Sequence, residues 1–235
     1  MKLTAIVSAL LVFLFSSLST ITAQWQQTNG PGGRQINALQ VDGTRVFAGT
    51  SGGVYLSTNN GSSWTVRNNG LTNALVNALA KKDSFILAGT SGGVFRSSDA
   101  GTEWSAASTG LSTLDIKAFA VVGSTLFAGT LDGIFRSTNN GTNWTSVDTI
   151  LVIPFVQCFG VIGTTLFVGT AGSGVFRSTN NGTTWTSTSS GLASGNIRAL
   201  AAIGTTLFAG TDTRGVYRST NNGTNWTQVR SGMTD

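Results

Sequence analysis

The sequence contains no histidine, two prolines and a single cysteine, Cys158, among 235 residues. Without histidine, neither a Ser-His-Asp triad nor a Cys-His pair can form, and a zinc site lacks both imidazole and paired thiolate ligands. A lone cysteine cannot form an internal disulfide. Because Cys158 lies in the apolar string 156–161, we expect it to be a buried small hydrophobic residue. The sequence therefore predicts no metal site and no cofactor.

Charged residues are also scarce, at 10% of the chain, with 14 Lys and Arg against 9 Asp and Glu. The resulting formal charge is +5. The longest basic run is Lys81-Lys82, so the basic stripe that contacts with nucleic-acid phosphates require is missing. We therefore predict that the protein does not bind nucleic acid.

Long apolar runs are absent beyond the first 23 residues. Met1–Ala23 has a basic residue, Lys2, an apolar stretch over 5–15 and a small final residue, the form of a secretory signal peptide. The alternative is a membrane anchor. It is disfavoured because the stretch is shorter than the roughly 18 apolar residues of a membrane span. We expect 24–235 to be one exported domain that does not insert into a membrane and is secreted, periplasmic or on the cell surface.

Glycine is abundant, with 31 residues, and an eight-residue pattern of the type Ser-Thr-Asn-Asn-Gly-Thr-Asn-Trp occurs five times. The copies begin at Ser57, Ser97, Ser137, Ser178 and Ser219. A spacing of about 40 residues indicates repeated supersecondary units. A second marker of the type Phe-Ala-Gly-Thr precedes each copy.

Each repeat resembles four short strands separated by turn signals. Asn-Gly pairs, as at Asn60-Gly61 and Asn140-Gly141, tolerate the positive φ that hairpin turns need. Four antiparallel strands per repeat are typical of a β-propeller blade. We predict an all-β propeller of five four-stranded blades, in which the opening segment Trp25–Thr28 helps to close the ring. The alternative is an arc of a larger propeller.

The octapeptide resembles the Asp-box, or bacterial neuraminidase repeat, whose pattern is Ser-x-Asp-x-Gly-x-Thr-Trp. Only Asp99 keeps the aspartate, which Asn59, Asn139, Asn180 and Asn221 replace. Proteins with this repeat include sialidases, xyloglucan-degrading glycosidases, sortilin-type receptors and relatives of the photosystem II assembly factor. The amino-acid sequence of the repeats is most similar to the last group and to uncharacterised secreted bacterial repeat proteins.

The resemblance implies a structural role for the conserved positions of the motif in every copy. These residues are Ser57, Asn59, Gly61, Trp64, Ser97, Asp99, Gly101, Trp104, Ser137, Asn139, Gly141, Trp144, Ser178, Asn180, Gly182, Trp185, Ser219, Asn221, Gly223 and Trp226. We also expect the tryptophans, which start the outermost strands, to cover the gap between blades.

No residues form a recognisable catalytic motif. Asp115, Asp132 and Asp212 are candidates for the paired carboxylates of glycoside hydrolysis, but isolated loop aspartates are commonly solvated turn residues. The repeat arginines occupy one position per repeat, so symmetry spreads them round the ring instead of clustering them. We therefore predict a non-enzymatic binding or scaffold module that recognises a glycan or a cell-surface protein. The alternatives are a sialidase-like or other glycosidase and an assembly factor for a protein complex.

The two faces of the predicted propeller differ in how much the repeats vary. The octapeptide turns are nearly identical, whereas the turns between second and third strands and the links between blades diverge. Binding groups are commonly carried by loops on a rigid scaffold, although loop drift without a ligand explains the variation equally well. The candidate ligand-binding residues on this face are Arg34, Asp115, Asp132, Phe155, Asp212 and Arg214.

Overall fold

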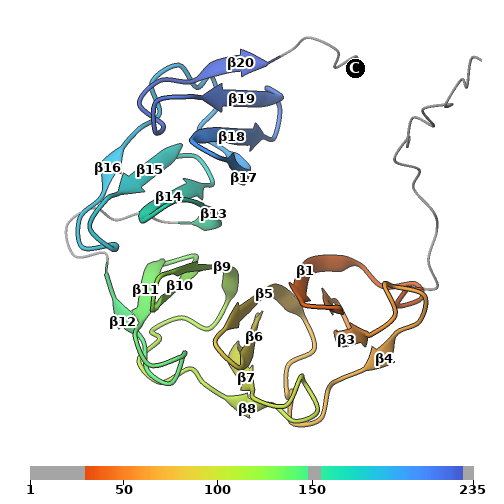
Figure 1. Cartoon of the computed structure of the whole chain (residues 1–235). Coiled ribbons are helices and arrows are strands. Elements are labelled where there is room, and N and C mark those ends of the chain that lie inside the picture. Colours follow the sequence, from red (N-terminus) through yellow and green to blue (C-terminus); the bar gives the residue numbers. More distant parts are fainter. Residues whose placement is uncertain (1–29, 148–154, 230–235) are drawn as a thin grey trace, which may run out of the picture.

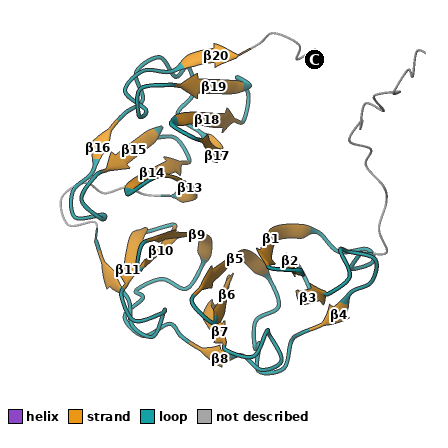
Figure 2. Cartoon of the chain, viewed as in Figure 1, coloured by secondary structure: helices purple, strands orange, loops and turns teal. Residues whose placement is uncertain are grey.

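The computed structural model describes residues 30–147 and 155–229. In these ranges the chain forms five antiparallel sheets of four strands each, and Figure 2 shows strands and loops without a helix. Each sheet uses four strands that are consecutive in the sequence, as a propeller blade requires. The five predicted four-stranded blades are thereby confirmed.

The blades are numbered 1 to 5 in chain order. Blade 1 consists of β1 (Ile36–Asp42), β2 (Arg45–Thr50), β3 (Gly53–Ser57) and β4 (Thr65–Val66). Blade 2 consists of β5 (Val76–Lys82), β6 (Phe85–Thr90), β7 (Gly93–Ser97) and β8 (Ser105–Ala106). Blade 3 consists of β9 (Ile116–Val122), β10 (Thr125–Thr130), β11 (Gly133–Ser137) and β12 (Thr145–Ser146). Blade 4 consists of β13 (Val156–Ile162), β14 (Thr165–Thr170), β15 (Val175–Ser178) and β16 (Thr186–Ser187). Blade 5 consists of β17 (Ile197–Ile203), β18 (Thr206–Thr211), β19 (Val216–Ser219) and β20 (Thr227–Val229).

The octapeptide turn is held by its own side chains. In the copy at Ser137, the hydroxyl oxygen accepts a hydrogen bond from the Gly141 N–H at 3.0 Å and donates one to the Asn139 amide oxygen at 2.9 Å. Asn140 has a φ of 55°, a left-handed conformation that asparagine tolerates. In the copy that keeps aspartate, Asp99 accepts the corresponding bond from Ser97. An uncharged acceptor therefore serves this turn as well as a carboxylate.

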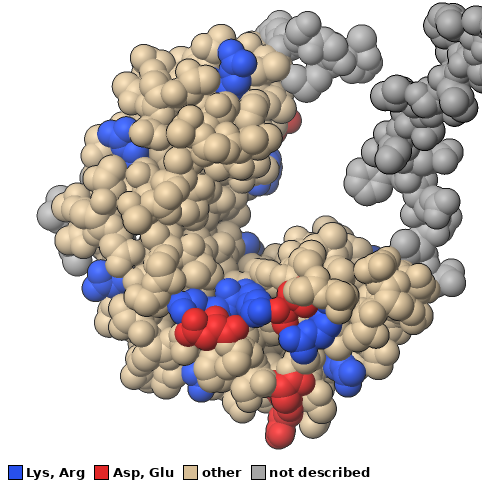
Figure 3. Space-filling model, viewed as in Figure 1, with Lys and Arg blue, Asp and Glu red and all other residues tan. Residues whose placement is uncertain are grey.

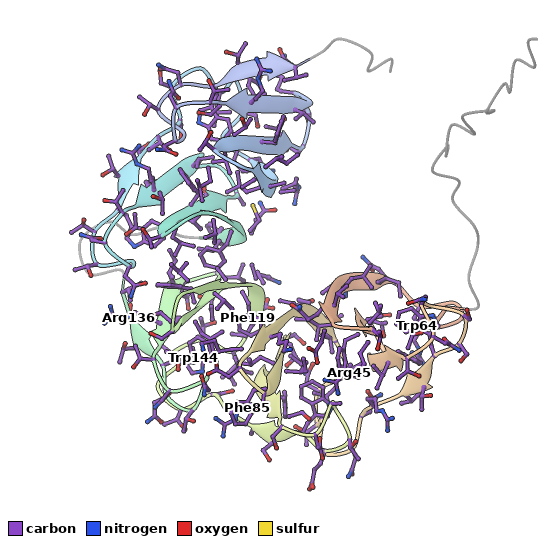
Figure 4. The ribbon with its side chains drawn as sticks, viewed as in Figure 1. Arg45, Trp64, Phe85, Phe119, Arg136 and Trp144 are labelled. Carbon is purple, nitrogen blue, oxygen red and sulfur yellow. The ribbon has the colours of Figure 1, made fainter. Side chains whose placement is uncertain are left out.

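The core lies between blades, where one face of each sheet packs against the next blade. A glycine on the second strand permits this approach: a Cβ at Gly129 would lie 2.3 Å from Val156 of blade 4, and one at Gly89 would lie 2.5 Å from Ile116 of blade 3. At the outer edge, Trp144 is 2% exposed and stacks on Phe119 at 6.2 Å between ring centroids (Figure 4). The close approach and the covering role of the tryptophan are both as predicted.

Figure 1 shows that the five blades follow one another round an open arc, with β1, β5, β9, β13 and β17 on its concave side. Blades 1 and 5 do not meet, so the expected ring is not formed by the described residues, and the arc describes the arrangement instead. The physical reason lies near the axis. Side chains near the axis, such as Phe119 and Phe159, pack against the second-strand glycine of the preceding blade, and in a close-packed interior such contacts set the angle between blades. At the angle adopted here, five blades do not complete a turn (Figure 1). Trp25–Thr28 lies outside the described residues.

Candidate functional site

The candidate binding face carries the turns between second and third strands and the links between blades. We call it the variable face. The six residues that we singled out from the sequence do not form one cluster there. Arg34 lies at blade 1, where its Nε donates to the Tyr55 hydroxyl at 3.0 Å. Asp132 and Arg214 sit in exposed turns of blades 3 and 5, and the N–H of each donates to a threonine hydroxyl of its own turn.

Asp115 and Asp212 are each tied to neighbouring side chains. Asp115 forms an ion pair with Lys117 at 2.7 Å. Asp212 accepts hydrogen bonds from Ser194 at 3.1 Å and Asn196 at 2.8 Å. Although Asp212 is exposed, desolvation raises its pKa, but the hydrogen bonds from Ser194 and Asn196 lower it, and the net pKa lies below the usual value for Asp. An acid that stays ionised in this way is unsuited to donate a proton to a leaving group.

Phe155 lines a hollow of about 350 Å³ whose lining residues come from blades 3, 4 and 5. Its side chain is 49% exposed and its φ is +57°, a strained conformation for a bulky residue. Two backbone bonds hold it there: its N–H donates to Leu131 O at 2.9 Å, and its carbonyl accepts from the Ala171 N–H at 2.9 Å. The chain therefore fixes this aromatic ring at the surface. The hollow is lined by Lys117, Leu131, Phe155, Val156, Gln157, Ala171 and Arg198.

The polar side of the hollow comes from the second residue of the inner strands. In blades 1 and 2 this position is asparagine, and Asn37 and Asn77 each donate to a backbone carbonyl of the next blade, at 2.9 and 3.0 Å. From blade 3 onward the position changes to Lys117, Gln157 and Arg198. Arg198 Nη1 donates to Gln157 Oε1 at 3.0 Å, so the two side chains are held together across adjacent blades.

These three residues were not among the predicted site residues. The signal that would have found them is the change from asparagine to lysine, glutamine and arginine at one aligned position of the repeat. Lys117 is paired with Asp115, whereas the four ion pairs of the described residues do not include Arg198. The hollow therefore combines an exposed ring, an amide and a guanidinium, and none of its lining residues is acidic.

A second hollow, of about 290 Å³, lies between blades 1 and 2 on the opposite face. Asp42 binds both Lys81 and Arg45 there, and Figure 3 shows acidic and basic side chains gathered together. The hydrogen bond from Lys81, with further contributions from Arg45, lowers the pKa of Asp42 despite its partial burial. The Lys81–Asp42 pair links blade 2 to blade 1. Because the opposite charges of this cluster neutralise one another, little net charge is left to attract a ligand.

The remaining reactive groups are inert or dispersed. Burial raises the pKa of the Cys158 thiol to about 12, which keeps it protonated and unreactive at neutral pH. The repeat arginines lie in different joints, and Arg96 rests over the Phe85 ring at 4.5 Å. Among the residues placed by the structure, no three His, Cys, Asp or Glu side chains cluster as a metal site would require. Over the same part of the chain, no helix is long and apolar enough to cross a membrane.

Comparison with known proteins supports the fold. A family model described as the DUF6242 beta propeller domain matches residues 84–191, which is less than half of the chain. No curated protein sequence matches. Among solved structures, the chain is similar to the extracellular domain of the putative one component system BT4673 from B. thetaiotaomicron, at 17% identity and a TM-score of 0.70, over 83% of this chain and 28% of that one.

Two further similar structures are an enzyme and a protein bound to a peptide. The Niastella koreensis GH74 enzyme is 19% identical with a TM-score of 0.66, over 82% of this chain and 38% of that one. YCF48 bound to D1 peptide is 14% identical with a TM-score of 0.62, over 83% of this chain and 66% of that one. The chain thus spans only 28% of the first structures that it matches. Likeness at these identities shows the β-propeller fold, which hosts enzymes and binding proteins alike.

Proposed function

We propose that this protein is an exported, non-catalytic binding module that holds an acidic glycan in the hollow beside Phe155. The observation that carries the proposal is the placement of an exposed aromatic ring next to the Gln157–Arg198 pair. A sugar ring can lie on the aromatic face, and a guanidinium is well suited to bind a carboxylate through two parallel hydrogen bonds. The ligand class is therefore a glycan that carries carboxylates.

The absence of acidic residues from the lining of the hollow supports a role without catalysis. Glycoside hydrolysis generally needs two carboxyl groups on either side of the scissile bond. The nearby Asp115 is neutralised by Lys117, and Asp212 is held in its ionised form. Export is supported by the character of residues 1–23 and by the likeness to an extracellular domain. N-terminal sequencing of the exported product tests this prediction, and we expect the mature chain to begin near Gln24. Recovery of Lys2 in the mature chain would contradict export through a cleaved signal peptide.

A glycan array that includes neutral and carboxylate-bearing sugars tests the ligand class. We expect binding to acidic sugars, a loss of about tenfold or more for Arg198→Gln, as for one charge-assisted hydrogen bond, and a similar loss for Phe155→Leu. The matched control is Arg214→Gln, an exposed arginine of the same face outside the hollow. Equal binding by all three variants, or a preference for neutral sugars, contradicts the proposal.

The second candidate is a module that binds a protein, which the likeness to a propeller bound to a peptide favours. The carboxylate at a peptide C-terminus would use the same arginine. A silent glycan array combined with capture of acidic C-terminal peptides, abolished by Arg198→Gln, would select this alternative. Turnover of a chromogenic glycoside that Asp132→Asn abolishes would instead select a hydrolase.

A further inference from the structure

The two ends of the arc expose surfaces that the interior blades bury. We call the surface of blade 5 that faces away from blade 4 the leading face, and the surface of blade 1 that faces away from blade 2 the trailing face. On the leading face Ile203 is 73% exposed, and Phe208 is half-buried although its counterparts Phe127 and Phe167 are fully buried. On the trailing face Leu39 is 63% exposed. Apolar area of this kind is stabilised by removal from water.

The leading face contains an empty socket. At each of the four interior joints, a β-branched side chain of the next blade occupies the space beside the second-strand glycine, as Val156 does beside Gly129. At Gly210 a Cβ would meet only Ala199 of the same blade, at 3.8 Å. The residue of the trailing face that is equivalent to Val156 is Ile36, which is 43% exposed, whereas Val156 is fully buried. Ile36 is therefore the side chain whose shape this socket accepts.

The tryptophans give a second, independent correspondence. At three interior joints the indole N–H donates to the carbonyl three residues after the tryptophan of the preceding blade, in the pairs Trp104–Arg67, Trp144–Ala107 and Trp226–Thr188 at 2.7–2.9 Å. Trp64, at the edge of blade 1 (Figure 4), is half-buried and donates to Gly61 of its own turn. The carbonyl at the equivalent position after the last blade belongs to Val229.

The repeat arginines supply a third correspondence. Arg96 Nη1 donates to Asn140 O at 3.2 Å, and Arg177 Nη1 donates to Asn222 O at 3.0 Å, in each case in the octapeptide turn of the next blade. Arg218 occupies the same position in blade 5 and is exposed. The equivalent carbonyl in blade 1 is that of Asn60.

From these three correspondences we infer that the leading face of one copy binds the trailing face of a second copy, in a joint built like those inside the chain. Ile36 enters the Gly210 socket, Arg218 reaches the Asn60 carbonyl, and Trp64 donates to the Val229 carbonyl. Because the two surfaces differ, the joint is head-to-tail, and each added copy leaves one face of each kind open until a ring closes. The inference is independent of the proposed ligand.

Sedimentation analysis of the mature protein over a range of concentrations tests the joint. We expect wild-type protein to form species larger than one copy as concentration rises. Gly210→Val fills the socket, and Ile36→Arg places a charge on the opposite half. Both positions are open in a single copy and Gly210 does not have a positive φ, so both variants should fold, as circular dichroism can check, and each should remain a single copy.

Mixing the two variants is the sharper experiment. Gly210→Val keeps an intact trailing face and Ile36→Arg keeps an intact leading face, so an equimolar mixture should form a one-to-one pair and nothing larger. The matched control is Leu75→Arg, an apolar residue of similar exposure in a link between blades, which should assemble like the wild type. A wild-type protein that stays a single copy, an assembly that survives both substitutions, or a mixture that fails to pair overturns the inference.

Discussion

The joint between blades 3 and 4 and the leading face of blade 5 carry nearly the same residues in different surroundings. Phe127 and Ile134 are fully buried in the joint, while Phe208 and Val216 at the same positions of blade 5 are half-buried. Both sheets nevertheless have four strands in the same order and register. The comparison teaches that a blade's internal hydrogen bonding does not depend on a neighbour, whereas the burial of its faces does.

The tryptophans should give the largest contrast between an interior position and an end position. Trp144→Ala removes a ring that is 2% exposed and whose N–H bonds to Ala107 O, so we expect a loss of about 3 to 5 kcal/mol in the free energy of unfolding. Trp64→Ala removes a half-buried ring and should cost clearly less. Denaturant unfolding at a concentration where the protein is a single copy measures both. Equal losses would show that Trp64 is buried against a partner or another segment.

A side chain added at the second-strand glycine should separate the same two environments. Gly129→Val places its Cβ 2.3 Å from Val156, and such overpacking should cost about 3 kcal/mol. Gly210→Val meets nothing closer than Ala199 at 3.8 Å and should leave the stability of a single copy nearly unchanged. Thermal unfolding of the pair checks this, and a strongly destabilised Gly210→Val would mean that the leading face is already occupied.

The octapeptide turns should behave alike in both places, because their bonds are local. Ser137→Ala and Ser219→Ala each remove the acceptor of a buried glycine N–H, with bonds of 3.0 and 2.9 Å. Each should cost about 1 to 3 kcal/mol, the penalty for an unsatisfied buried donor. Asn143→Ala, an exposed change within the same turn, should be nearly neutral. A cost confined to the interior copy would show that neighbouring blades, not the serine, hold the turn.

Acid should produce the smallest effect, and part of it should come from blades 1 and 2. The pKa of Asp42 is lowered by Lys81 and Arg45, and that of Asp99 by Ser97 and the Glu103 N–H. A lowered folded-state pKa contributes stability that is complete above the unfolded value, about 3.9 for Asp. That stability disappears as pH falls through the folded values.

Because Lys81 and Arg45 are about two-fifths exposed, solvent screening keeps the effect small. Asp42→Asn should therefore flatten the acid dependence of unfolding below about pH 4. The parallel substitution Asp132→Asn, in an exposed turn of the other face, serves as the control. An Asp42→Asn variant with the acid profile of the wild type would contradict this assignment.

The candidate site shows where prediction from sequence succeeded and where it stopped. Phe155 could be singled out because the link before blade 4 is unlike the other links, and the structure places its ring on a hollow. Arg198 and Gln157 were not singled out, although the change from asparagine at their repeat position is visible in the sequence, because a strand position that is polar in every repeat commonly faces solvent without binding anything. Only the stacking of blades 4 and 5 brings them within 3.0 Å of one another.

By itself, the sequence determined the repeat, the four strands of each blade and the octapeptide turns, because these depend on residues close together in the chain. Asn140, for example, adopts its positive φ for reasons contained in the turn itself. The tertiary structure alone decided that the blades form an open arc, which end surfaces stay exposed and which side chains share a hollow. These properties depend on the total rotation from blade 1 to blade 5. That rotation adds up small packing differences at each of the four joints.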